Sequence, residues 1–126
     1  MMNGPLACSL DATDEFEAFG ETTPVSSYPG GIFSQFTLIP LPNHIVSITG
    51  WGTDPAYGAY WIVRNSWGTY WGENGYAKVK MGSHNLGIED ACSWATPTKR
   101  PREVKSASGD GKIQVAPLFC ASQATL

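Results

Sequence analysis

The segment YWIVRNSWGTYWGENGY, residues 60–76, constrains the fold of this 126-residue chain more than any other feature. An apolar, β-branched run ends at the polar residue Asn65, and tryptophans and glycines crowd the positions that follow. β-Branched and aromatic residues favour a paired strand, whereas closely spaced glycines favour tight, irregular turns. The segment therefore predicts a strand that places Asn65 at its end, beside a turn that carries two indole rings.

A second apolar segment, PNHIVSITGWG, puts a histidine at the start of an alternating run. His44, Val46 and Ile48 fall on one face of an extended strand, and the residues between them fall on the other. Two glycines after this run allow a bend, and the following stretch TDPAYGA has the composition of a hairpin connection. We therefore expect His44 and Asn65 to lie on neighbouring antiparallel strands.

The rest of the chain predicts a β-rich α+β domain with few helical residues, because prolines and glycines interrupt most apolar runs. The further elements expected are a strand over residues 6–10, one short helical turn over 14–19 capped by Thr13 or Asp14, a structured loop over 21–42, a strand over 76–81 and a turn-like segment over 83–92. We assign residues 1–96 to one domain.

Charge separates this domain from the residues that follow it. Residues 1–96 hold nine acidic and three basic residues, whereas residues 97–126 hold two acidic and five basic ones. The second segment is rich in Pro, Ser and Lys, and we expect it to be a disordered tail. An acidic domain without a basic, aromatic-interleaved surface argues against a nucleic-acid partner.

Other classes of protein are also disfavoured. No window approaches the roughly 18 apolar residues of a membrane span, and the first residues, MMNGPLACSL, do not have the pattern of a signal peptide. The three cysteines are wrongly spaced for a zinc site, so we expect no metal site and no cofactor. One disulfide with one cysteine left over is the plain interpretation.

Six ordered motifs resemble the C-terminal half of the papain-like cysteine proteases, and most of all their cathepsin X (cathepsin Z) branch, which are carboxypeptidases. The motifs are NGPLACSLDAT, GGIFSQF, NHIVSITGWG, YWIVRNSWG, WGENGY and NLGIEDAC. The resemblance implies that residues 1–96 form the antiparallel, barrel-like right-hand domain of the papain-like fold. It gives no counterpart to residues 97–126.

The resemblance also implies roles for individual residues. His44 and Asn65 would be the His and Asn of a Cys-His-Asn triad, in which the amide orients the imidazole. Trp67 would cover the contact between them, and Trp71 would support it. A histidine alone at a strand start is more often a satisfied structural residue, so the assignment of His44 depends on the surrounding motifs.

Further residues are assigned by the resemblance alone. Cys8 and Cys92 would form a disulfide, which leaves Cys120 over. Ser9, Pro42 and Ile45 would line part of the pocket for the substrate residue before the cleaved bond. We also expect Trp67, Trp71 and Pro42 to form an apolar wall on the surface that faces the substrate. His84 lies in a polar turn and is assigned no function.

The nucleophile of this family is the missing part. In papain-like proteases the cysteine lies about 130 to 150 residues before the histidine, whereas His44 has 43 residues before it. We therefore expect the chain to need an N-terminal half that carries the cysteine, and to be inactive alone toward peptide or protein substrates. The family implies a lysosomal or extracellular location. The alternative is a non-catalytic module that binds peptides or a protein partner.

Overall fold

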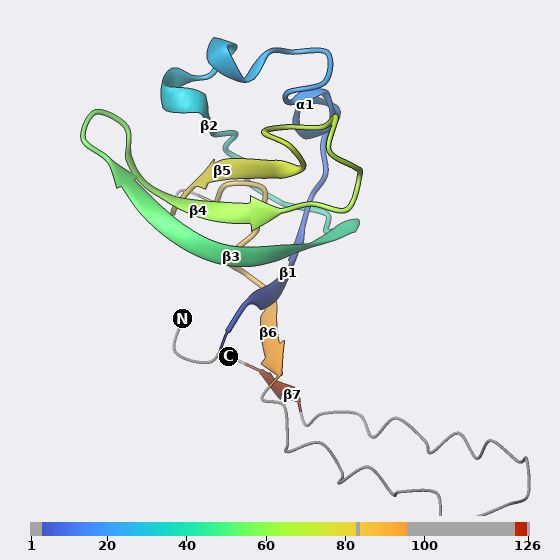
Figure 1. Cartoon of the computed structure of the whole chain (residues 1–126). Coiled ribbons are helices and arrows are strands. Elements are labelled where there is room, and N and C mark those ends of the chain that lie inside the picture. The colour runs from blue at the N-terminus through green and yellow to red at the C-terminus, as the bar shows by residue number, and fades with distance from the viewer. Residues whose placement is uncertain (1–3, 83, 96–122, 126) are drawn as a thin grey trace, which may run out of the picture.

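The described chain forms seven strands in one curved sheet, with short helices on one side of it (Figure 1). The structure is a computed structural model that describes residues 4–82, 84–95 and 123–125. The strands are β1 Leu6–Leu10, β2 Ile32–Phe33, β3 His44–Asp54, β4 Gly58–Arg64, β5 Tyr76–Lys80, β6 Cys92–Ala95 and β7 Gln123–Thr125, and the helices are α1 Asp14–Ala18, η1 Val25–Ser27 and η2 Pro29–Gly31. Within these ranges no helix has the length and apolar character that crossing a membrane requires.

The sheet order is β2-β5-β4-β3-β1-β6-β7, and every pair is antiparallel except β2 with β5. β3 is the central strand, with β1 on one side and β4 on the other. The expected antiparallel neighbours are therefore present. Strand pairing does not join the edge strands β2 and β7 within the described residues, so the barrel-like shape expected from the sequence corresponds to a curved sheet.

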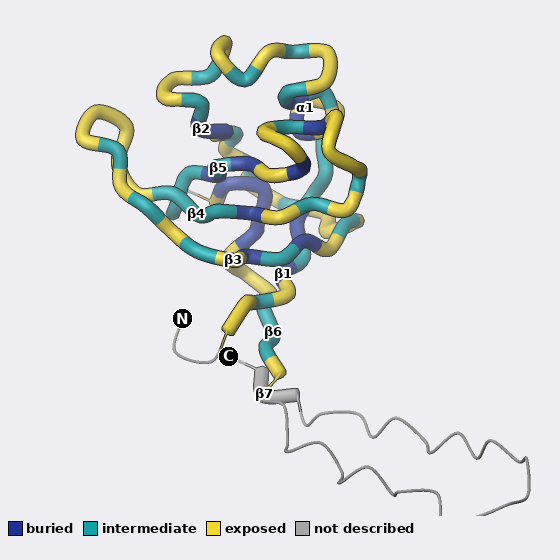
Figure 2. The backbone as a smooth tube through the Cα atoms, viewed as in Figure 1, coloured by how far each residue is buried: buried dark blue, intermediate teal, exposed yellow. Residues whose placement is uncertain are grey.

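The core is formed by buried residues of the sheet, of the segment around α1 and of residues 84–90. Figure 2 shows the buried positions along the backbone. Its fully or nearly fully buried residues are Cys8, Leu10, Phe16, Phe19, Phe33, Val46, Ile48, Val63, Trp71, Ala77, Val79, Leu86 and Ile88. Cys8 and Cys92 are register partners on β1 and β6, and they form the expected disulfide. This bond ties the strand beside β3 to the last part of the domain.

Helix α1 begins as the sequence predicts. The Thr13 side chain accepts a hydrogen bond from the backbone N–H of Phe16 at 3.3 Å, which makes it the N-cap. After the helix, Gly20 has a left-handed φ of 73°, and a Cβ there would collide with the backbone of Gly72. Glycine at both positions lets the loop after Trp71 pack directly on the end of α1.

Two local expectations differ from the structure. β3 does not end in a bend at its glycines but continues to Asp54, with a register shift between Ile48 and Gly50. The Tyr60 ring lies where a Cβ on Gly52 would be, at 2.5 Å from its hydroxyl, so this glycine makes room for a neighbouring side chain. The loop expected over residues 21–42 contains η1, η2 and the short strand β2.

The end of the domain also contains more strand than expected. β6 begins at Cys92, and residues 123–125 pair with it as β7, from Ser93↔Thr125 to Ala95↔Gln123. The sequence predicts no regular element in either place, because both are short and lack a clear alternating pattern. The remainder of the segment expected to be disordered, residues 97–122 and Leu126, lies outside the described residues, as does Cys120. The domain boundary at residue 96 stays a prediction.

Candidate active site

The two polar residues singled out in the sequence meet at one end of the sheet. His44 is the first residue of β3, and Asn65 follows the last residue of β4. The backbone N–H of Asn65 donates to the carbonyl of Gly75 at 2.9 Å, which fixes the chain where it leaves the strand. Because β3 and β4 are adjacent and antiparallel, the start of one lies beside the end of the other.

The His44 imidazole and the Asn65 amide are in direct contact. His44 Nε2 lies 2.8 Å from Asn65 Oδ1, and the backbone N–H of Ser66 donates to the same oxygen, also at 2.8 Å. A backbone N–H can only donate, so the atom facing it must be the amide oxygen. His44 Nε2 must then carry the proton of its hydrogen bond, whether the ring is neutral or charged.

This hydrogen bond determines which ring nitrogen of His44 is available to accept a proton. With the proton on Nε2, the neutral imidazole has its lone pair on Nδ1. Nδ1 has no hydrogen-bond partner among the described residues, and the imidazole is partly exposed. The imidazole can therefore take up a proton at Nδ1 while Asn65 Oδ1 holds the other nitrogen.

Only one of the two polar atoms of the Asn65 side-chain amide has hydrogen-bond partners among the described residues. Its Oδ1 accepts two hydrogen bonds, whereas its Nδ2 is buried and has no partner within the described part of the chain. A buried amide N–H without an acceptor costs about 1 to 3 kcal/mol. The amide is thus held for its contact with the imidazole at some cost to stability, as functional side chains often are.

Trp67 packs against the imidazole of His44, and Trp71 packs against Trp67. The Trp67 indole stacks on the His44 ring, with centroids 4.6 Å apart and planes inclined by 22°. Trp71 packs edge-on against Trp67, at 5.2 Å and 89°. An apolar ring over a hydrogen-bonded imidazole limits access of water, and a hydrogen bond is stronger in the resulting low dielectric.

The expectation of an apolar wall that includes Trp71 is wrong. Trp71 is 1% exposed and belongs to the core, and its Nε1 donates to the carbonyls of Phe16 and Glu17. Trp67 is half-buried, and Pro42 is exposed. Trp71 is buried because its indole N–H finds acceptors at the end of α1, a partner that the sequence does not reveal.

The residues assigned to a substrate pocket are partly brought together. Ser9 and Ile45 are register partners on β1 and β3, so their side chains share the face opposite to His44. Ile45 is 68% exposed. Pro42 lies just before β3, and no hydrogen bond between the described residues connects the three side chains. Their role stays a prediction.

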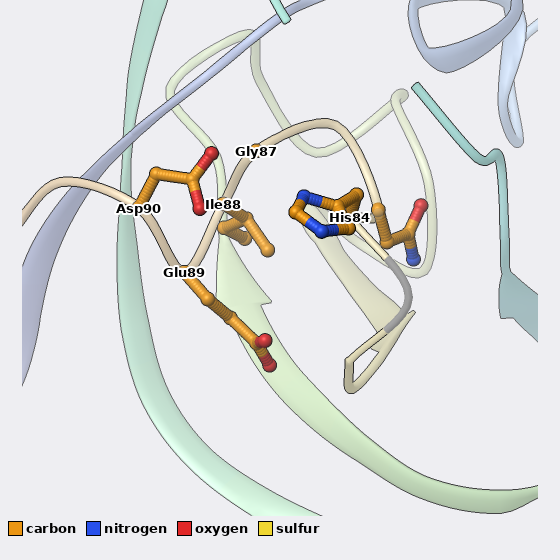
Figure 3. Close-up of a pocket in the computed structure, with 6 residues that line it drawn as sticks. His84, Gly87, Ile88, Glu89 and Asp90 are labelled. Atoms are coloured by element: carbon orange, nitrogen blue, oxygen red, sulfur yellow. The ribbon is translucent and has the colours of Figure 1, made fainter. Parts of the chain in front are cut away.

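A separate hollow lies in the loop after β5 (Figure 3). It has a volume of about 140 Å³ and is lined by His84, Asn85, Gly87, Ile88, Glu89 and Asp90. Figure 3 shows the carboxylates of Glu89 and Asp90 pointing in different directions. Glu89 accepts from Trp61 Nε1 at 2.7 Å and from the backbone of Gly82 at 3.0 Å, so it stabilises the loop. His44 does not line this hollow.

Sequence reasoning missed two contributors to the candidate site. The Ser66 backbone N–H sets the orientation of the Asn65 amide, and the Phe16 ring packs against Trp71 and Trp67 at 5.1 and 5.8 Å. A backbone group leaves no trace in the sequence. Phe16 lies 51 positions before Trp67, so only the tertiary fold reveals their contact.

A family model described as papain family cysteine protease matches residues 1–96. Among relatives, cathepsin Z from Onchocerca volvulus is 42% identical over an alignment of 103 residues, which covers 75% of this chain and 30% of that protein. Human cathepsin O is 43% identical over 93 residues, covering 71% of this chain and 25% of that protein. This chain thus spans between a quarter and a third of the length of these relatives.

A solved structure is also similar. It was determined to explain the limited antibody cross-reactivity between the mite allergens Blo t 1 and Der p 1. Its TM-score is 0.56 at 33% sequence identity, and the match covers 68% of this chain and 25% of that one. About two thirds of this chain therefore shares its fold with a protein of known structure.

Proposed function

Because this chain belongs to the papain family of cysteine proteases, we propose that it supplies the imidazole and the orienting amide of a cysteine peptidase site. The observation that carries the proposal is the 2.8 Å contact between His44 Nε2 and Asn65 Oδ1, with the Ser66 N–H on the same oxygen. It leaves His44 Nδ1 as the nitrogen that faces a nucleophile. His44 and Asn65 form the catalytic pair, and Trp67 and Trp71 support it.

In the proposed reaction, His44 Nδ1 takes the proton of a cysteine thiol and holds the sulfur as a thiolate. The thiolate attacks the peptide carbonyl, and the imidazolium then gives the proton to the leaving amine. Water, deprotonated by the same nitrogen, releases the acyl group and restores the thiol. Asn65 does not exchange a proton in this cycle, but it keeps the ring in one orientation throughout.

The nucleophilic cysteine comes from a complementary N-terminal half in this proposal. Cys8 and Cys92 are joined in a disulfide, so neither offers a thiol to His44. Cys120 does not have the sequence context of the family's nucleophile. The chain Met1–Leu126 alone is therefore expected to hydrolyse no peptide, since the covalent step has no agent.

Substrate and location follow from the same family membership and belong to the proposal. The proposed substrate is a peptide or protein, cleaved at its carboxyl end as the resemblance to the cathepsin Z branch implies. Ser9, Pro42 and Ile45 contact the residue before the cleaved bond. A lysosomal or extracellular location suits the Cys8–Cys92 disulfide, because such bonds persist in oxidising compartments.

The test is complementation. The chain Met1–Leu126 is mixed with the part of Onchocerca volvulus cathepsin Z that lies outside the matched segment, and hydrolysis of a fluorogenic peptide is measured. Activity that appears only on mixing supports the proposal, provided that His44→Ala abolishes it and His84→Ala, a matched histidine control, does not.

Two outcomes contradict the proposal. Hydrolysis by the isolated chain, lost with Cys120→Ser, places the nucleophile inside it. A mixture that forms a stable complex and binds peptide but never cleaves it favours the alternative, a non-catalytic binding module.

A further inference from the structure

Phe16 connects the short helix α1 to the aromatic rings beside the candidate site. Its side chain is fully buried, and its backbone N–H is capped by Thr13. Thr13 in turn donates to Gln35 Oε1 at 2.6 Å, which ties the helix start to the loop after β2. A helix of five residues is not stable by itself, so packing and capping determine where α1 sits.

The Phe16 ring contacts both tryptophans of the site. Its centroid lies 5.1 Å from that of Trp71 and 5.8 Å from that of Trp67, edge-on in both cases. These geometries are the ones that aromatic pairs prefer. Trp67 in turn stacks on His44. Phe16 therefore contacts the ring next to the imidazole without contacting the imidazole.

The backbone of the same helix holds Trp71 from a second direction. Trp71 Nε1 donates to the carbonyl of Glu17 at 3.0 Å and, more weakly, to that of Phe16 at 3.3 Å. Because its ring packs against Phe16 and its N–H is engaged at the end of α1, Trp71 cannot rotate without breaking both contacts. Trp67 lies between this fixed ring and His44.

We propose that Phe16 is a positioning residue for His44, which acts through Trp67 and Trp71 to hold the imidazole against Asn65 before any nucleophile is present. This inference rests on the proposed peptidase function for its biological meaning, but its structural content does not. It assigns to α1 the task of pre-forming the half-site within this chain.

The test follows the His44 Nε2 proton by NMR in the whole chain, because an imidazole N–H gives an observable signal only where hydrogen bonding and burial slow its exchange with water. We expect it to exchange slowly in the wild type. Replacing Phe16 with Leu removes both ring contacts, and the exchange should become at least about tenfold faster through local opening.

Phe33 is the matched control. It is as fully buried as Phe16, and its ring pairs with the rings of Phe16, Phe19 and Tyr28 but, among the described residues, with neither tryptophan at the site. Phe33→Leu should lower thermal stability about as much as Phe16→Leu while leaving the exchange of the His44 proton within about twofold of the wild type. Phe16→Tyr keeps the ring and should preserve slow exchange.

If Phe16→Leu prevents folding, Phe16→Met conserves volume more closely and gives the same comparison. Equal exchange rates in the Phe16→Leu or Phe16→Met variant and the wild type overturn the inference, as does an equal acceleration in Phe33→Leu. Neither result bears on complementation. Conversely, a mixture without peptidase activity contradicts the proposed function and leaves the positioning of His44 by Phe16 intact.

Discussion

The two halves of β3 belong to one continuous strand but lie in different environments. In residues 44–48 every second side chain is directed into the core, and Val46 and Ile48 are 4% and 1% exposed. In residues 50–54 no residue is buried, and Trp51 is 56% exposed. Figure 2 shows the change along the strand, from the packed end to the exposed hairpin with β4. His44 lies at the packed end.

The difference comes from a second strand. β1 pairs with β3 from Leu10↔His44 to Leu6↔Ile48 and no further, whereas β4 accompanies β3 to Asp54. Residues 44–48 are thus held on both edges, and residues 50–54 on one. An alternating sequence predicts that a strand exists, but its burial depends on what pairs with it and packs over it. The candidate site occupies the half that is fixed from two sides.

The largest expected effect comes from releasing β1. The Cys8–Cys92 disulfide closes a loop with a sequence separation of 84 residues, which the chain-entropy model values at about 4 to 5 kcal/mol as an upper figure. The double variant Cys8→Ser, Cys92→Ser should lose most of the free energy of unfolding measured in urea. A loss below about 1 kcal/mol would show that β1 is held without the bond.

The next effect separates the two halves of β3 directly. Ile48→Ala removes a fully buried side chain and should cost about 2 to 4 kcal/mol of unfolding free energy. Trp51→Ala, three positions along the same strand, should cost less than about 1 kcal/mol, since half of the ring is already exposed. Equal losses of unfolding free energy in the two variants would show that the two halves of β3 do not differ in how much they contribute to stability.

Asn65→Ala should separate stability from function at the packed end. The variant loses two hydrogen bonds to Oδ1, at about 1 kcal/mol each, but it also removes the buried Nδ2 that has no partner among the described residues. The unfolding free energy should change by less than about 1 kcal/mol. Peptidase activity of the complemented mixture should fall on the order of 10- to 100-fold, because the imidazole loses its orientation.

The smallest effect concerns pH. Burial of Tyr28 against Phe19 and Phe33, together with the negative charge of Glu15, raises the pKa of its phenol above the ordinary value of 10.0. The neutral phenol is therefore favoured in the folded state. The stabilisation is complete below the ordinary pKa and is lost as the pH rises through the raised one. Thermal melts above pH 10 should show this loss, and Tyr28→Phe should lack it.

Much of the candidate site can be predicted from the sequence, and the features that cannot be predicted have physical reasons. The alternating run from His44 and the apolar run before Asn65 predict adjacent strands, and six motifs identify the papain family and its cathepsin Z branch, which the comparisons confirm. The burial of Trp71 does not follow, because it depends on carbonyls of α1 more than fifty residues away. A local sequence pattern does not reveal which distant groups will pack over a side chain.

The short pairings were missed for a related reason. β2 has two residues and pairs in parallel with β5, and β7 has three residues. Runs this short carry too few alternations to distinguish a strand from a loop. The assignment of His44 and Asn65 depended on recognising motifs rather than on periodicity, and their catalytic roles stay proposals.

The most direct test of the central claim measures how fast the nucleophilic cysteine of the complementary half is alkylated by iodoacetamide at pH 6. A thiol with an ordinary pKa near 8.5 is almost unreactive at this pH, whereas a thiolate beside an imidazolium reacts readily. Adding the wild-type chain should accelerate alkylation at least about tenfold, and adding the His44→Ala chain should not. An equal acceleration by both chains, in complexes of equal stability, would contradict the assignment of His44 as the catalytic imidazole.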